Sequence, residues 1–246
     1  MDRELPPGPP NVIGLVIPGP FTVGETVTVS DAATHHLRVR RAIVGNAMSL
    51  YDGDGTIAEG QLTALSTHRG EIVITSVRQA ARPPAVHLLA PIADRERMLW
   101  LAEKATELGV TSWRAVRWRR SRSVSPRGEG PSFVAKVHAR MCAAAEQSGN
   151  PWLPTIEPDV DPAEAAAHAP GARYLLTSGA PPISGPLAAP VTLALGPEGG
   201  IEPDEAALFE RSGFLPVSVG AHTLRFETAG VIAVGLVRAM LEHRNE

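Results

Sequence analysis

The sequence predicts an α/β protein in which a small β-rich domain, residues 1–81, precedes a larger domain, residues 82–246. The first part carries short β-branched or alternating runs separated by glycine and proline turns, a pattern typical of a small barrel. After Arg82-Pro83-Pro84 the apolar residues alternate between strand-like and helix-like spacing. This alternation is typical of a mostly parallel sheet covered by helices.

We expect four strands in the first domain, each bounded by turn residues such as Pro18-Gly19-Pro20 and Asp52-Gly53-Asp54-Gly55. The proline-rich first ten residues precede them. The four expected strands are Thr26–Ser30, Met48–Tyr51, Thr56–Leu65 and Glu71–Val77.

In the second domain a helical spacing begins at Asp94 and stops at Gly109, and another follows Ser132, a candidate N-cap, and ends before Gly149. Compact apolar runs between the helical segments predict buried strands. The expected strands are Val86–Ala90, Trp113–Trp118, Tyr174–Thr177, Val191–Leu195 and Leu215–Val219. The expected helices are Asp94–Leu108, Ser132–Ser148, Pro203–Ser212 and Glu227–His243.

Composition excludes several classes of protein. The 246 residues are 43% hydrophobic and carry a net charge of -3, with no apolar run near the roughly 20 residues that span a bilayer. The first residues lack the basic region and apolar core of a signal peptide, and the single cysteine, Cys142, excludes an internal disulfide. We therefore expect a cytoplasmic protein, with Cys142 and Trp100 buried in their helices.

Two glycine-bearing loops follow predicted strands of the larger domain. One is Gly196-Pro197-Glu198-Gly199-Gly200, and the other begins at Val219-Gly220. Parallel α/β sheets bind ligands beyond the carboxyl ends of their strands, and glycines let a ligand approach the main chain. The spacing matches neither a dinucleotide fingerprint nor a phosphate loop, and the acids Glu198 and Glu202 favour a cationic ligand. A tight strand-to-helix turn explains the first loop equally well.

The order of several motifs resembles a known family. The motifs are Glu103-Lys104-Ala105-Thr106-Glu107-Leu108-Gly109-Val110, Arg120-Ser121-Arg122-Ser123, Ala145-Glu146-Gln147-Ser148, Leu195-Gly196-Pro197-Glu198-Gly199-Gly200 and Leu224-Arg225-Phe226-Glu227-Thr228-Ala229. With His36-Leu37-Arg38-Val39-Arg40-Arg41 near the start, they resemble the small-subunit ribosomal RNA methyltransferase E family of the SPOUT superfamily. The resemblance implies a PUA-like first domain and a SPOUT second domain with a deep trefoil knot. It also implies a homodimer that uses S-adenosylmethionine to form 3-methyluridine in 16S rRNA, within the small ribosomal subunit.

The resemblance assigns site residues. Those expected to bind S-adenosylmethionine are Thr177, Leu195, Gly196, Pro197, Glu198, Gly199, Gly200, Val219, Gly220 and Leu224. Those expected to contact RNA are Arg38, Arg40, Arg41, Arg119, Arg120, Arg122 and Gln147. We expect Arg225 to stabilise the uracil anion or an RNA phosphate, and Glu227 to orient Arg225 or remove the uracil N3 proton. For Glu227, a favourable position in the first helical turn is the alternative.

Six arginines lie between positions 114 and 127 without an acid among them: Arg114, Arg117, Arg119, Arg120, Arg122 and Arg127. They favour a phosphate-binding strand and loop, with Trp113 and Trp118 available for stacking; the alternative is a solvated loop in an arginine-rich chain. No metal is expected, because His35 and His36 have no partner ligands at the right spacing.

The last helix is apolar around much of its circumference, which favours a homodimer; a helix buried wholly within its own domain is the alternative. Its apolar residues are Ala229, Val231, Ile232, Val234, Leu236, Val237, Met240 and Leu241. Two other functions stay open: an RNA-binding protein of the same fold without activity, and a related methyltransferase with a different RNA target.

Overall fold

The structure is a computed structural model that describes residues 12–123 and 126–242. The proline-rich residues 1–10 and His243, at the end of the last predicted helix, lie outside the described residues. The chain divides into two compact units. Unit 1 is Met1–Arg82 with Ala145–Trp152, and unit 2 is Pro83–Ala144 with Leu153–Glu246. Each unit has a hydrophobic core of its own.

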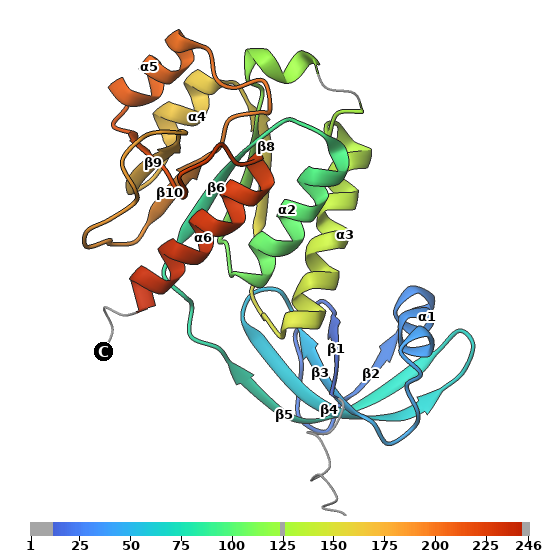
Figure 1. Cartoon of the computed structure of the whole chain (residues 1–246). Helices are drawn as coiled ribbons and strands as arrows, with labels where there is room; N and C mark the ends of the chain where they lie inside the picture. Colours follow the sequence, from blue (N-terminus) through green and yellow to red (C-terminus); the bar gives the residue numbers. More distant parts are fainter. Residues whose placement is uncertain (1–11, 124–125, 243–246) are drawn as a thin grey trace, which may run out of the picture. The chain divides into compact units, whose positions relative to one another are not determined.

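Unit 1 is built on a five-stranded sheet in the order β1-β3-β4-β5-β2 (Figure 1). Strand β1 pairs in parallel with β3, and the other pairings are antiparallel. The strands are β1 (Ile13–Val16), β2 (Thr26–Val29), β3 (Ala47–Tyr51), β4 (Thr56–Leu65) and β5 (Gly70–Gln79), with one helix, α1 (Asp31–Val39). All four predicted strands form. The sequence did not predict β1 and α1, because Gly14 interrupts the apolar run of β1 and α1 is rich in weak helix formers.

The segment Ala145–Trp152 packs with unit 1 although it is distant in sequence. The Val16 N–H donates to Glu146 Oε1 at 3.0 Å, and the Gly55 N–H donates to the Pro151 carbonyl at 3.0 Å. Arg82 lies 5.0 Å from the ring centroid of Trp152. The sequence offered no sign that the chain returns to unit 1, since this depends on contacts between positions 70 or more residues apart.

Unit 2 contains a six-stranded sheet in the order β11-β9-β10-β6-β7-β8, in which every pairing is parallel. Its strands are β6 (Val86–Pro91), β7 (Ser112–Val116), β8 (Thr155–Val160), β9 (Ala172–Leu176), β10 (Val191–Ala194) and β11 (Leu215–Val217). Strand β10 is buried along its whole length, as expected of a central parallel strand. The predicted parallel α/β sheet is therefore confirmed.

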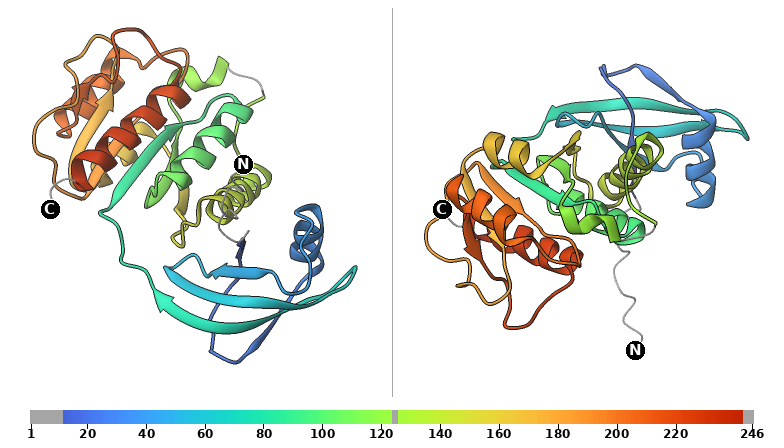
Figure 2. Two further views of the ribbon diagram at one scale, coloured as in Figure 1. Left: turned by 60° about the horizontal axis from the view of Figure 1, so that its bottom comes forward. Right: turned by 90° about the horizontal axis from the view of Figure 1, so that it is seen from above.

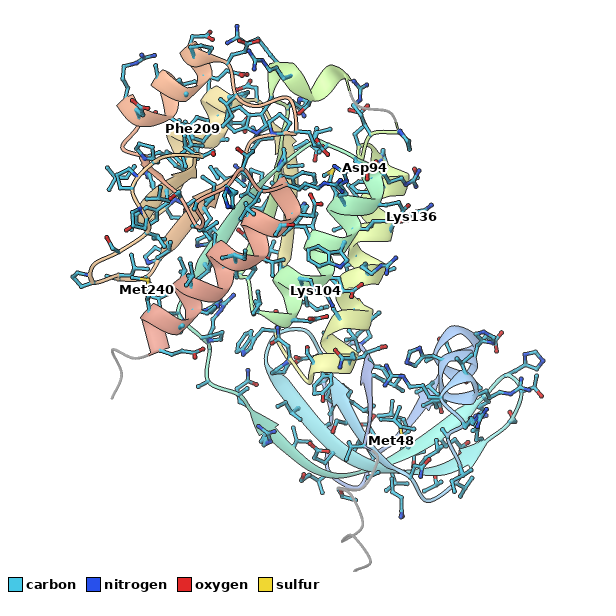
Figure 3. The ribbon with its side chains drawn as sticks, viewed as in Figure 1. Met48, Asp94, Lys104, Lys136, Phe209 and Met240 are labelled. Atoms are coloured by element: carbon cyan, nitrogen blue, oxygen red, sulfur yellow. The ribbon has the colours of Figure 1, made fainter. Side chains whose placement is uncertain are left out.

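Helices cover both faces of this sheet (Figures 1 and 2). One face carries α2 (Arg95–Glu107), α3 (Pro131–Ser148) and α6 (Phe226–Glu242), and the other carries α4 (Pro162–His168) and α5 (Pro203–Arg211). Figure 3 shows Phe209 on α5; its ring is buried between those of Trp118 and Phe214. The short 3-10 helix η1 (Arg119–Ser123) follows β7.

Several predictions for unit 2 were wrong in detail. Helix α3 begins at Pro131, so Ser132 lies inside the first turn and is not its N-cap. Trp100 is 42% exposed and Cys142 is half-buried, because both face away from the core on their helices. Trp113 and Trp118 are 2% and 1% exposed, so neither ring is available to stack on a base.

The elements β8, α4 and η1 were not predicted. Strand β8 contains a proline and two acids, and α4 has only seven residues, so local patterns gave little signal. In the part of the chain that the structure describes, no helix combines the length and apolarity needed to span a membrane.

Candidate active site

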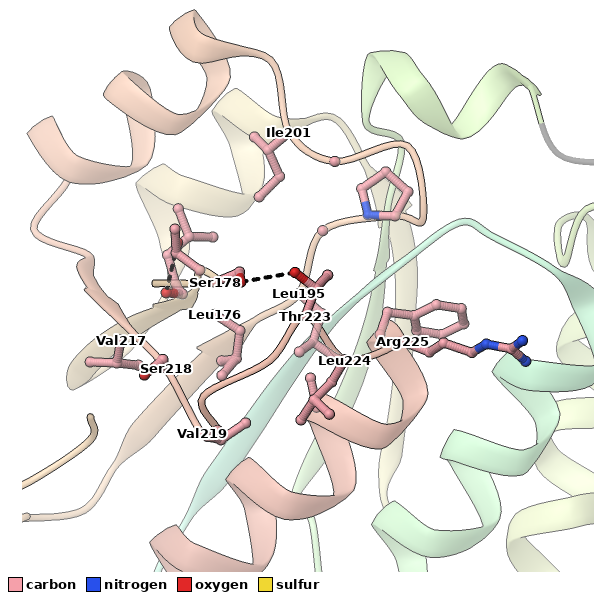
Figure 4. A pocket seen from close by; sticks show the side chains of 18 of the residues that line it. Leu176, Ser178, Leu195, Ile201, Val217, Ser218, Val219, Thr223, Leu224 and Arg225 are labelled. Atoms are coloured by element: carbon pink, nitrogen blue, oxygen red, sulfur yellow. Dashed lines mark hydrogen bonds between the residues drawn. The ribbon is translucent and has the colours of Figure 1, made fainter. Parts of the chain in front are cut away.

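Three neighbouring strands of unit 2 end at one cavity. The loops that follow β9, β10 and β11 enclose a volume of about 540 Å³, a size that suits a cofactor (Figure 4). The Thr177 N–H donates to the Val217 carbonyl at 2.9 Å, and the hydroxyls of Ser178 and Thr223 are 3.1 Å apart. These two hydrogen bonds join the loop after β9 to strand β11 and to the loop that follows it.

Nine of the ten residues predicted to bind the cofactor line this cavity: Thr177, Leu195, Gly196, Pro197, Glu198, Gly200, Val219, Gly220 and Leu224. The tenth, Gly199, is not among the lining residues. A Cβ atom at Gly199 would lie 3.1 Å from the Cβ of Arg120, so the open side of this glycine faces Arg120. Tertiary structure therefore brings together the two glycine-bearing loops that the sequence singled out.

The sequence did not identify about half of the cavity wall. The additional lining residues are Leu175, Leu176, Ser178, Ile201, Ala206, Val217, Ser218, His222, Thr223, Phe226 and Ala229. Seven of these eleven residues are apolar, and five of the seven lie inside predicted strands or helices, where their pattern signals only burial. The main chain of the glycine loops adds polar groups to those of the serine, threonine and histidine side chains.

Gly196 and Gly200 have local reasons to be glycine. A Cβ atom on Gly196 would come within 2.6 Å of Ile201 Cγ1, and Gly200 has a φ of +78°, in the left-handed region. The loop closes with the Gly200 N–H donating to the Pro197 carbonyl at 2.8 Å. This tight turn leads into α5, where Pro203 occupies the first turn as predicted.

Arg97 on α2 joins two acids of the site, and the sequence did not single it out. Its Nη1 lies 3.2 Å from Glu198 Oε1, and its Nε lies 3.9 Å from Glu227 Oε1. Glu198 lines the cavity, whereas Glu227 is in the first turn of α6 and only 7% exposed. Glu227 Oε2 is buried, with no hydrogen-bond partner among the described residues. A buried acceptor without a partner is costly, so this oxygen is a candidate for a proton or a ligand donor.

Arg225 also lines the cavity but is exposed. In Figure 4 its guanidinium extends away from Val217, Ser218 and Val219. The interaction described for Glu227 is with Arg97 and not with Arg225. The two predicted residues therefore lie at the start of α6 in different environments: the cation Arg225 is exposed and the acid Glu227 is buried.

Four of the arginines between positions 114 and 127 form ion pairs, three of them with acids from other parts of the chain. Arg114 pairs with Glu157 on β8, Arg119 with Asp204 and Glu205, and Arg127 with Glu129. Asp204 has its pKa lowered by the hydrogen bond from Arg119. Arg120 contacts Glu202 and the Gly199 carbonyl. The backbone of Arg122 lies in η1, and its side chain is outside the described part of the chain.

The remaining predicted RNA contacts lie in unit 1. Arg38 is in the last turn of α1, and Arg40 and Arg41 follow it; all three are exposed. Arg41 has a φ of +56°, which places it in the turn that ends the helix. Gln147 is exposed in the last turn of α3, next to Glu146, whose Oε2 lies 3.4 Å from His36 Nε2. Unit 1 thus holds four of the seven predicted RNA residues on its surface.

Among the described residues, no cluster of three or more histidine, cysteine or acidic side chains has a geometry that could hold a metal ion. The polar groups around the cavity are hydroxyls, main-chain groups, the acid Glu198, the imidazole of His222 and the guanidinium of Arg225.

The chain is similar in sequence to known proteins. Residues 80–238 match the model of the RNA methyltransferase domain family. The chain is 28% identical over 239 residues to ribosomal RNA small subunit methyltransferase E of Synechocystis, with 93% of this chain and 78% of that protein covered. It is 29% identical over 234 residues to the Mycobacterium bovis protein of the same name, with 89% and 87% covered.

Solved structures agree. The crystal structure of ribosomal RNA small subunit methyltransferase E from Neisseria gonorrhoeae bound to S-adenosylmethionine has a TM-score of 0.83 and 26% identity, covering 93% of this chain and 98% of that one. A methyltransferase from Legionella pneumophila in complex with the same cofactor has a TM-score of 0.83 and 25% identity, with 93% and 98% covered. The resemblance indicated by the sequence motifs is confirmed, and the chain belongs to the RNA methyltransferase domain family.

Proposed function

We propose that this protein transfers a methyl group from S-adenosylmethionine to N3 of a uridine in 16S rRNA of the small ribosomal subunit. The single observation that carries the proposal is the cavity at the carboxyl ends of β9, β10 and β11. It lies inside the segment matched to the RNA methyltransferase family, and relatives of similar fold bind S-adenosylmethionine.

The residues present fit this cofactor. The apolar side chains of Leu176, Ile201 and Val217 suit an adenine ring, while the main chain of Gly196, Gly200 and Gly220 offers hydrogen-bonding groups. Glu198 places a carboxylate at the wall, which suits a ligand that carries a positive sulfonium. When bound, S-adenosylmethionine supplies an electrophilic methyl group. Gly199 was expected to join this set, and its role here is to let the loop approach Arg120 closely.

Two residues of this chain serve the reaction. Uracil N3 carries a proton and is a poor nucleophile until that proton leaves. The exposed guanidinium of Arg225 is available to stabilise the uracil anion or to hold an RNA phosphate. The buried carboxylate of Glu227, with one oxygen lacking a partner among the described residues, is suited to accept the proton. Arg97 forms an ion pair with the other oxygen of Glu227, at 3.9 Å.

RNA is proposed to bind to both units. The division into a PUA-like RNA-binding domain at residues 1–81 and a SPOUT methyltransferase domain at 82–246 rests on the resemblance, as does the trefoil knot. Arg38, Arg40, Arg41 and Gln147 support an RNA surface on unit 1, because all are exposed. On unit 2 the contacts expected from the sequence are Arg119, Arg120 and Arg122; the first two form ion pairs within the unit, and Arg119 and Arg122 are proposed as RNA contacts. We expect the protein to act in the cytoplasm without a metal ion.

The active form is proposed to be a homodimer. Ile232 and Leu236 on α6 are 37% and 40% exposed, and Trp100 on the neighbouring α2 is 42% exposed. Exposed large apolar residues on adjacent helices support a self-complementary interface beside the cavity. Val234, in contrast, is fully buried in its own unit.

Two measurements test the function. Calorimetry is expected to show saturable binding of S-adenosylmethionine. Nucleoside mass spectrometry is expected to show that 16S rRNA from a deletion strain has lost 3-methyluridine. RNA binding without cofactor binding would instead indicate an inactive RNA-binding protein. Cofactor binding with unchanged 3-methyluridine would indicate a methyltransferase with another RNA target.

A further inference from the structure

The segment Trp118–Arg120 contacts the loop Leu195–Gly200. The indole Nε1 of Trp118 donates to the Leu195 carbonyl at 2.9 Å, and this contact is buried. Arg120 Nη1 donates to the Gly199 carbonyl at 2.8 Å. Leu195 lines the cavity, whereas Trp118 and Arg120 do not. The segment therefore contacts the loop through residues that are not part of the cavity wall.

The same segment holds the start of α5. Arg120 Nε and Nη2 donate to the two carboxylate oxygens of Glu202 at 3.0 and 3.2 Å. The Arg119 N–H donates to Glu205 Oε1 at 3.0 Å, and Glu205 Oε2 accepts the Glu202 N–H at 3.1 Å. Glu205 is only 6% exposed, so its two hydrogen bonds are protected from water. A two-pronged arginine–carboxylate pair fixes direction as well as distance.

The segment Gly196–Gly200, called the cofactor loop below, needs such support. Three of its five residues are glycine, so its main chain has more conformational freedom than an ordinary loop. A ligand bound through main-chain groups loses affinity if those groups must first be ordered. Arg120 contacts the loop at the Gly199 carbonyl and the start of α5 at Glu202. These two contacts lie on either side of Gly200 in the sequence.

We propose that Arg120 is a positioning residue that orders the cofactor loop through Gly199 and Glu202. The inference rests on the proposed binding of S-adenosylmethionine to this cavity. It assigns Arg120 a role different from the phosphate contact expected from sequence, since its Nε, Nη1 and Nη2 all donate to the Gly199 carbonyl or to Glu202. The close approach of Gly199 to Arg120 Cβ then explains why a glycine that does not line the cavity belongs to the motif.

Calorimetry on the full chain tests this role. Arg120→Ala is expected to weaken S-adenosylmethionine binding about ten-fold or more, the effect of losing roughly one charge-assisted hydrogen bond. Arg120→Lys keeps the charge but not the two-pronged geometry and is expected to recover only part of the affinity. Arg117→Ala is the matched control, because it removes an exposed arginine three positions away. It should bind the cofactor as the wild type does.

Glu202→Gln provides a second variant that does not alter η1. Its effect and that of Arg120→Ala are expected to be less than additive, because both break the same pair. Hydrogen exchange of residues 195–202 without ligand should become faster in both variants. Exchange and cofactor affinity equal to those of the wild type would overturn the proposal.

The remaining outcomes are distinct. If Arg120→Ala retains cofactor affinity but lowers the salt slope of RNA binding by about one, Arg120 is a phosphate contact and the proposal fails. If the wild-type protein itself does not bind S-adenosylmethionine, the proposed function fails. Hydrogen exchange of the loop then still decides whether Arg120 orders it.

Discussion

Glu227 and Arg225 are two positions apart, yet their surroundings give them different chemical capacities. Arg225 is exposed at the cavity, while Glu227 is buried beside Arg97 with one oxygen lacking a partner among the described residues. An acid placed in the first helical turn only for the dipole would normally be exposed to water. The burial of Glu227 therefore favours a chemical role over the dipole interpretation.

Glu227→Gln is expected to lower kcat on the order of 100-fold, the usual range for removing a general base, while leaving S-adenosylmethionine affinity unchanged. Glutamine keeps the shape of the side chain and removes its charge. Steady-state kinetics with 16S rRNA substrate and calorimetry with the cofactor measure the two effects. The control is Glu96→Gln, an exposed acid in the first turn of α2. If kcat is unchanged in Glu227→Gln, Glu227 has only a structural role in the first turn of α6.

Gly196→Ala is expected to weaken cofactor binding at least ten-fold. The new methyl group would meet Ile201 Cγ1 at 2.6 Å, so Ile201 would have to move within the cavity wall. Gly220→Ala is the comparison on the opposite wall, where the added Cβ would make an ordinary 3.6 Å contact with Leu224. It should change the Kd only a few-fold. Equal Kd values for the two variants would show that crowding at Ile201 does not matter.

At the scale of elements, α6 and the end of α2 are joined by a buried arginine. Arg238 Nε donates to the Leu108 carbonyl at 2.9 Å, and its Nη1 and Nη2 donate to the carbonyls of Pro84 and Gly109. Burial lowers the pKa of Arg238, although arginine stays charged in proteins. One side chain thus satisfies carbonyls at the end of α2 and before β6.

Arg238→Met should lower the free energy of unfolding by about 3 kcal/mol, roughly 1 kcal/mol for each carbonyl left without a donor. Urea denaturation measures the change. Arg211→Met, an exposed arginine at the end of α5, serves as control and should shift stability by less than about 0.5 kcal/mol. Equal stability of the two variants would mean that water replaces the guanidinium at these carbonyls.

At the scale of the whole molecule, oligomeric state decides whether the cavity works alone. Leu236→Glu places a charge on the exposed apolar face of α6 and is expected to give an inactive monomer near 26 kDa, the mass of one chain. Light scattering at micromolar concentration, with methyltransferase activity, measures both properties. Val234→Glu would not serve, because Val234 is fully buried and a charge there would disrupt the unit's own core.

Leu215→Glu is the control, since Leu215 is 60% exposed on the edge strand β11, whereas α6 packs on β10 and β6. It should remain a dimer with full activity. A wild-type protein that is monomeric and active would refute the dimer outright. A Leu236→Glu protein that remains an active dimer would place the interface elsewhere.

The sequence by itself determined the α/β class, the parallel sheet and the two glycine-bearing loops. These features are local: apolar spacing sets strand or helix, and a glycine at a strand end marks a turn with an open main chain. Its motifs were specific enough to indicate the family. Elements such as β1 and α4 escaped prediction because Gly14 interrupts the apolar run of β1 and the seven residues of α4 carry little periodic signal.

Only the tertiary structure decided which side chains meet. The arginines after β7 have no acid among them in sequence, yet Glu202, Asp204 and Glu205 of α5 reach them across some 80 residues. The pairing of Arg97 with Glu198 and Glu227 likewise joins three separate elements. Ion pairs depend on distance in space and leave no periodicity in the chain. The segment Trp118–Arg120, which was expected to bind phosphate, therefore contacts the loop Leu195–Gly200 in the folded protein.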